Sequence, residues 1–149
     1  MRRGSDRVRQ STRADGRREE AKMPARVAMG ELSWVESSGR ITVPGTIPIV
    51  PVGKAEQHGL HIAMNTDVIV PREITLEVAR RINGIIAPTI TYGYKSIERR
   101  GGGNPFSGTT GLDGNTLICL VRDIWREVAR RGARRFLLCI HPLISSREP

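Results

Sequence analysis

The segment KAEQHGLHIAMNTD, residues 54–67, carries the side chains of this sequence that are best suited to metal-assisted chemistry. Glu56 and His58 are two residues apart, so in an extended chain they point to the same side, and His61 and Asp67 follow shortly after. Carboxylate oxygen and imidazole nitrogen are ligands of zinc and manganese, and no cysteine lies nearby to favour a structural thiolate site. A solvated polar loop with incidental histidines is the alternative that this spacing leaves open.

A second polar segment, residues 92–117, is rich in glycine and in short hydroxyl and amide side chains. The three consecutive glycines Gly101, Gly102 and Gly103, followed by Asn104, let the backbone approach a small ligand closely. No Lys-Ser or Lys-Thr pair follows the last glycine, which disfavours a nucleotide-binding phosphate loop. Ligand capture and a flexible hairpin are equally compatible with this composition.

Short apolar runs predict three β-strands. The run Ile47–Val52 is rich in β-branched residues, although its two prolines weaken the ladder of hydrogen bonds. Residues 85–90 predict a second strand, interrupted by Pro88, and residues 136–140 predict a third. The strands are separated by stretches long enough for helical crossovers.

Helical periodicity fills the stretches between these strands. After a loop over 53–70, Pro71 is expected as the first residue of a helix that stops at Gly84, because proline is tolerated at a first helical position. A second helix is expected from a cap at Asp113 or Asn115 to Gly132, with an apolar stripe along one face. Alternating strands and helices predict an α/β fold with a mostly parallel sheet, in which the chemistry gathers at the carboxyl ends of the strands.

The composition is that of a globular domain and excludes a membrane-spanning chain. The 149 residues include 38% hydrophobic and 26% charged side chains, and no apolar run approaches the roughly 20 residues that a membrane helix needs. Cys119 and Cys139 both lie in apolar surroundings and form no close pair in sequence. This use of cysteine favours a reducing, cytoplasmic location.

The net charge of +9 is concentrated at the N-terminus. Residues 1–26 hold nine Lys/Arg and four Asp/Glu, a net of +5, which leaves +4 for the rest of the chain. Residues 1–28 contain too few apolar side chains to compensate for the entropy lost on ordering, and we interpret them as a disordered basic tail. Without interleaved aromatic residues or a base-reading motif, nucleic-acid binding is not favoured.

Several motifs together resemble the creatininase (creatinine amidohydrolase) family, over residues 29 to 139. The resemblance implies a layered α/β/α fold, often assembled as a hexamer, in which residues 29–149 form the N-terminal portion of the domain. The most specific match is EQHG-x-H followed by Asp67, nine residues beyond His58. The matching segments are MGELSW, IPIVPVGKAEQHGLHIAMNTD, APTITYGYKS, GGGNPFSGTTGLDGNTL and ARRGARRFLL.

The resemblance also implies a site with two divalent metal ions, zinc or manganese. By analogy, Glu56 would bind one ion, His58 would bind the other, and Asp67 would bridge both, with His61 in a supporting role. Two such cations can activate both water and an amide carbonyl. The implied substrate is a small cyclic amide such as creatinine, opened to creatine, and Gly101–Asn104 would line its pocket. No residue is assigned as a catalytic acid or base.

The sequence departs from the family after residue 138. Relatives continue with an Asn-Gly-His-x-Glu type segment that supplies two further metal ligands, whereas this chain reads CIHPLISSREP. His141 stands one residue before the family histidine, and Pro142 takes that position. The alternative hypothesis is therefore a truncated or frame-shifted, catalytically incompetent fragment, or an oligomer-dependent interaction module with a bare sheet edge.

Overall fold

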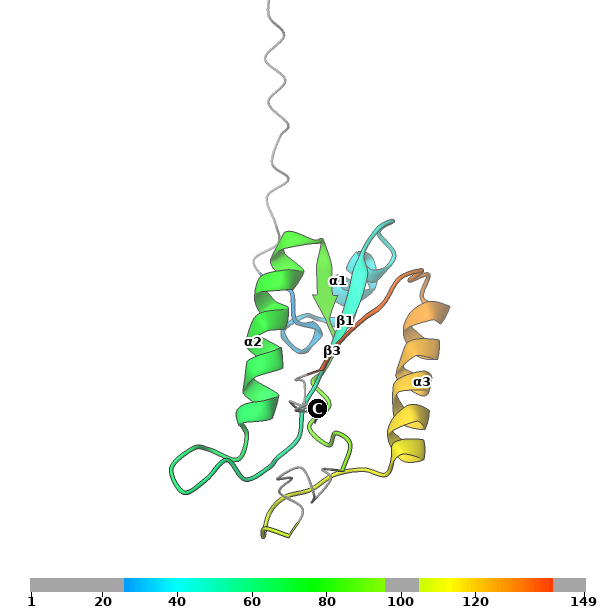
Figure 1. The fold of residues 1–149 in the computed structure, drawn as a ribbon. Coiled ribbons are helices and arrows are strands. Elements are labelled where there is room, and N and C mark those ends of the chain that lie inside the picture. The colour runs from blue at the N-terminus through cyan, green and yellow to red at the C-terminus, as the bar shows by residue number, and fades with distance from the viewer. Residues whose placement is uncertain (1–25, 96–104, 141–149) are drawn as a thin grey trace, which may run out of the picture.

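The computed structural model describes residues 26–95 and 105–140. Their three strands form one parallel sheet in the order β2-β1-β3, and the helices α2 and α3 lie on opposite sides of it (Figure 1). The fold is thus the expected α/β/α arrangement with a parallel sheet. Along the chain the elements are η1 (Met29–Glu31), α1 (Trp34–Ile41), β1 (Ile47–Val52), α2 (Thr66–Arg81), β2 (Gly84–Ile86), α3 (Gly114–Arg130) and β3 (Leu137–Ile140).

The central strand β1 divides the core into two apolar clusters. Successive side chains of a strand point to opposite faces, so Ile49 packs on the α2 side whereas Val50 and Val52 pack on the α3 side. All three are almost fully buried. The first cluster includes Val27, Ala79 and Ile86, and the second includes Ala87, Ile90, Leu117, Val121, Ile124, Phe136 and Leu138.

The helix α2 begins at Thr66, five residues before the start that we predicted at Pro71. Pro71 lies inside the helix, where it has no N–H to donate to the carbonyl of Asp67 four residues earlier. That carbonyl lies against Gly53. The early start matters for the site, because it places Asp67 in the first turn of α2 instead of in a loop.

The predicted bounds are confirmed for β1 and for the start of α3, whereas β2 is shorter than predicted. The strand β1 has the predicted bounds, and α3 follows directly after Asp113. The strand β2 ends at Ile86 instead of residue 90, and Pro88 lies between it and an isolated bridge from Ile90 to Val52. The three-residue length of β2 agrees with the loss of a ladder donor at proline.

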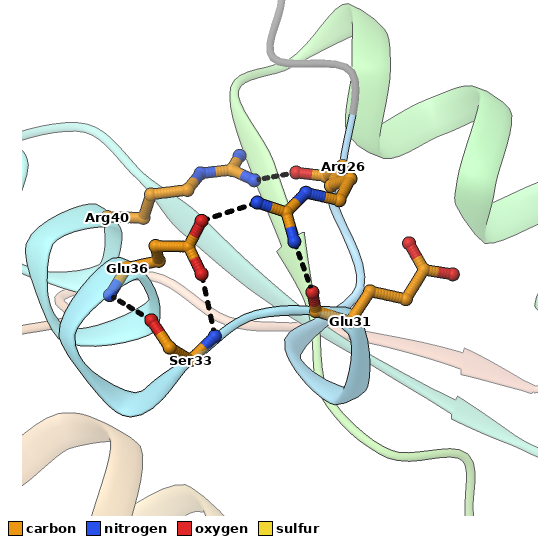
Figure 2. A network of polar contacts seen from close by, with 5 residues as sticks. All are labelled: Arg26, Glu31, Ser33, Glu36 and Arg40. Carbon is orange, nitrogen blue, oxygen red and sulfur yellow. Dashed lines mark hydrogen bonds and ion pairs between the residues drawn. The ribbon is translucent and has the colours of Figure 1, made fainter.

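The helix α1 is an element that we did not predict from the sequence. Its signal is a capping box, in which the Ser33 hydroxyl accepts from the backbone N–H of Glu36 and the Glu36 carboxylate accepts from the backbone N–H of Ser33. Figure 2 shows that Arg26 pairs with Glu36 and that Arg40 donates to the Arg26 carbonyl. Arg40 also donates to the carbonyl of Gly84 at 2.7 Å, which ties α1 to β2.

The last residues of the predicted tail, Val27 and Ala28, are packed against the rest of the domain. Val27 is 1% exposed and belongs to the α2-side cluster, and Ala28 forms a parallel bridge with Ile86. The physical reason is that Val27 extends the sheet beside β2, where its side chain is buried. Residues 1–25 of the predicted tail lie outside the described residues.

The strand β3 is an edge of the sheet formed by the described residues. Leu137 is 40% exposed and Ile140 is 56% exposed, although both are apolar. Between α3 and β3 lies an apolar groove of about 550 Å³, whose walls include Trp125 and Phe136 in edge-to-face contact. Within the described part of the chain, no helix is long and apolar enough to cross a membrane.

Candidate metal site

Three loop segments meet at the carboxyl end of β1. The N–H of Gly53, the residue after β1, donates to the carbonyl of Ile90 at 2.9 Å. The N–H of Thr110 donates to the carbonyl of Ala55 at 3.2 Å, and the N–H of Glu56 donates to the carbonyl of Met64 at 3.0 Å. These bonds hold the loop between β1 and α2 where ligand sites of open α/β sheets lie.

His58 and Asp67 face each other across this loop. His58 Nε2 lies 3.0 Å from Asp67 Oδ1, and both side chains are partly buried. Asp67 is positioned by the first turn of α2, and His58 is positioned by its second ring nitrogen, since Nδ1 lies 2.9 Å from the carbonyl oxygen of Glu56. The structure thus brings together two of the three predicted metal ligands.

The two contacts of the His58 ring are both satisfied when a proton or a metal ion lies between Nε2 and the Asp67 carboxylate. A carbonyl oxygen only accepts, so Nδ1 carries the hydrogen that is donated to Glu56. In the neutral ring, the Nε2 lone pair would then face an anionic carboxylate. A proton or a metal ion at Nε2 makes the contact favourable, and an Nδ1–H bonded to a carbonyl is the usual support for a metal-binding histidine.

The same surroundings change the proton affinity of the imidazole. The hydrogen bond to the Glu56 carbonyl raises the pKa of His58, and the Asp67 carboxylate raises it further, whereas partial burial lowers it. The net shift of the pKa is upward. In the metal-free protein, protonated His58 therefore neutralises Asp67 over a wider pH range than free imidazole would.

The Glu56 carboxylate pairs with Lys54 and also acts on His58, because its negative charge contributes to raising the pKa of that imidazole. Its Oε2 lies 3.0 Å from Lys54 Nζ, and both side chains are more than nine-tenths buried. Among the described residues, no group of three or more His, Cys, Asp and Glu side chains is arranged to hold a metal ion. His58 and Asp67 are in direct contact and Glu56 lines the same cavity as Asp67, so the role of these three side chains as metal ligands stays a prediction. The imidazole nitrogen of His58 and the carboxylate of Asp67 are ligand types that zinc and manganese take.

A small cavity of about 140 Å³ lies beside these side chains. Both charged and apolar residues line it, and it shares Val52, Leu117 and Ile140 with the larger apolar groove. The described residues alone enclose less space than a typical small-molecule site. The cavity is lined by Val52, Gly53, Lys54, Glu56, Asp67, Gly93, Tyr94, Leu117 and Ile140.

Other predicted residues fall outside the described part of the chain or are exposed. Gly101–Asn104 and His141 lie outside the described residues. His61 is exposed. Lys54 was not among the predicted site residues, although its position two residues before Glu56 places the two side chains on one side of an extended chain.

The described residues form an α/β/α domain with a histidine–carboxylate pair beyond the carboxyl end of its central strand. Residues 30–140 match the model of the creatininase family, described as creatinine amidohydrolase. The chain belongs to this family.

Two curated relatives and one solved structure illustrate the similarity. Creatinine amidohydrolase of Pseudomonas putida is 48% identical over 116 residues, which cover 78% of this chain and 45% of the relative. The mycofactocin precursor peptide peptidase of Mycobacterium ulcerans is 30% identical over 112 residues, covering 68% and 42%. A crystal structure of creatinine amidohydrolase is 47% identical with a TM-score of 0.72, covering 77% and 44%.

The family includes proteins solved with divalent metals. One similar structure is a manganese creatininase and another is a creatininase mutant of Zn–Zn type, each with a TM-score of 0.71 and 49% identity over 75% of this chain. The similarity covers 44% and 43% of those chains. This chain therefore spans less than half the length of the relatives that it matches.

Proposed function

We propose that this chain provides the metal-binding part of a creatininase-type amidohydrolase that acts on a small cyclic amide such as creatinine, giving creatine. The observation that carries the proposal is the contact between His58 Nε2 and Asp67 Oδ1, 3.0 Å apart at the carboxyl end of β1. Family membership and the manganese and Zn–Zn forms of similar creatininases support divalent metals as cofactors.

Hydrolysis of an amide near neutral pH requires activation of both the carbonyl and water. Divalent ions, when bound, polarise the carbonyl and make water more acidic. The residues of this chain supply the holding groups: His58 presents Nε2 because Glu56 fixes its other nitrogen, and Asp67 presents its carboxylate from a helix start. Glu56 stays a proposed third ligand, and Gly101–Asn104 stay proposed pocket residues.

Metal content is the first test, because it reports on the proposed ligands His58 and Asp67 without requiring turnover of a substrate. We expect the purified chain to retain zinc or manganese after dialysis, and Asp67→Asn to weaken that binding by at least about 100-fold, since it removes a direct ligand. Asp123→Asn is the matched control: Asp123 lies on α3, is 65% exposed and pairs only weakly with Arg122 and Arg126. Elemental analysis after equilibrium dialysis measures the bound metal in the wild-type chain and in the two variants.

Ring opening of creatinine by the same preparation tests the activity itself. Creatine formation that is lost in Asp67→Asn and kept in Asp123→Asn supports the hydrolase. A folded chain that holds no metal contradicts the proposal and favours the alternative of a non-catalytic fragment or interaction module. The exposed β3 edge and apolar groove would then be its contact surface.

Assembly and location extend the proposal. We expect a homo-oligomer, a hexamer by family resemblance, in the cytoplasm and without a nucleic-acid partner. The apolar residues left exposed on β3 support association. Sedimentation velocity of the purified chain tests this, and a monomer at all accessible concentrations would contradict it.

A further inference from the structure

Lys54 is a buried lysine at the candidate metal site. Its side chain is 6% exposed, its Nζ lies 3.0 Å from Glu56 Oε2, and both residues line the same cavity as Asp67. Lysine is almost never buried without a paired anion, because removing an ammonium group from water is unfavourable. The Lys54 ammonium group is therefore held by its ion pair with Glu56, because little water reaches it.

A comparison with Lys95 shows how unusual this environment is. Lys95 Nζ also forms a close ion pair, 2.7 Å from Asp113 Oδ1, but the two side chains are 49% and 72% exposed. Water screens that pair. The charge of Lys54 is screened far less, so it acts strongly on any further cation that approaches Glu56.

We propose that the ammonium group of Lys54 takes the place of one of the two cations expected at this site. Glu56 then pairs with Lys54 instead of serving as the third ligand that the family resemblance implies, and the site binds one divalent ion, at His58 and Asp67. This inference rests on the proposed function. Glu56 already has a cation 3.0 Å from its carboxylate oxygen, and a divalent ion at the same oxygen would meet direct repulsion in a desolvated pocket. The pair of His58 and Asp67 keeps the geometry for one ion.

The decisive measurement is the number of ions per chain. We expect one Mn²⁺ or Zn²⁺ per wild-type chain in isothermal titration calorimetry, and two per chain in Lys54→Met, which keeps the length of the side chain and removes its charge. Lys54→Arg keeps the charge and should bind one ion. Lys95→Met, which removes a lysine from an exposed ion pair, is the matched control and should also bind one ion.

A spectroscopic measurement on the wild-type chain keeps the test independent of how well the variants fold. A single bound Mn²⁺ ion gives an uncoupled electron paramagnetic resonance spectrum, whereas two ions about 3.5–4 Å apart give an exchange-coupled one. We expect the uncoupled spectrum from the wild-type chain at saturating Mn²⁺.

The possible outcomes separate this inference from the proposed function. Two ions in the wild-type chain, or a coupled spectrum, overturn the role of Lys54 and leave the metal-dependent hydrolase intact. One ion in a Lys54→Met variant with a native circular dichroism spectrum also overturns it. No ion in the folded wild-type chain overturns both proposals.

Discussion

Gly53, the residue that follows β1, lies directly against the backbone carbonyl of Asp67 in the first turn of α2: a Cβ atom at position 53 would stand 2.0 Å from that oxygen. Pro71, four residues on, has no N–H to donate to this carbonyl, so the strand end can approach it. From this helix start, the Asp67 carboxylate lies 3.0 Å from His58 Nε2.

We expect Gly53→Ala to lower the free energy of unfolding by about 3 kcal/mol, because the added methyl group must displace the start of α2. The same displacement should weaken metal binding. Urea denaturation checks the first effect and calorimetry the second. Gly39→Ala is the control: Gly39 lies on α1 with no atom within 4 Å of where the added methyl group would stand, so its stability should stay equal or rise by up to about 1 kcal/mol.

The raised pKa of His58 predicts opposite pH dependences for the metal-free fold and for metal binding. Protonated His58 stabilises the metal-free fold fully below the unfolded pKa of about 6.5, and this contribution is lost as the pH rises through the folded pKa. Metal affinity should instead fall as the pH drops through the folded pKa, because a proton competes for Nε2.

An NMR titration of the imidazole in the metal-free chain measures this pKa directly. We expect a pKa above the ordinary one, and a lower pKa in Asp67→Asn. The decrease should be partial, because the hydrogen bond to the Glu56 carbonyl is the largest cause of the shift and remains in that variant. An unshifted His58 in the wild-type chain would contradict the contacts of its two ring nitrogens.

The attachment of α1 depends on Arg40, whose guanidinium group donates to the carbonyls of Arg26 and Gly84, both at 2.7 Å. We expect Arg40→Met to lower the free energy of unfolding by about 2 kcal/mol, since two charged hydrogen bonds are lost at a partly buried position. Arg80→Met, which removes an exposed pair with Glu77, should change it by less than about 0.5 kcal/mol. Equal effects in the two variants would count against the anchoring role.

The exposed edge of β3 should promote association between chains. We expect Leu137→Lys to weaken self-association by roughly tenfold, because a charged side chain opposes strand pairing at an edge. Leu60→Lys is the control, since Leu60 is equally apolar and fully exposed but lies in a loop. Sedimentation velocity measures both, and an unchanged association in Leu137→Lys would place the contact elsewhere.

Local patterns predicted the elements whose signals lie within a few residues. The apolar β-branched run of β1 reflects burial on both faces of the sheet, the apolar stripe of α3 reflects one partly buried helix face, and both elements are found where expected. The start of α2 was misplaced because the rule for proline at a first helical turn is only statistical. The contact of Gly53 with the Asp67 carbonyl, in the first turn of that helix, joins residues fourteen positions apart.

The amino-acid sequence by itself determined the order of the three strands and the two long helices, because periodicity is a property of the chain alone, and its family resemblance singled out the candidate donors Glu56, His58 and Asp67. Only the tertiary structure decided which donors meet: His58 turns to Asp67, while Glu56 turns to Lys54. That choice depends on burial and on contacts between the end of β1 and the start of α2, which exist only once the sheet and helix are packed together.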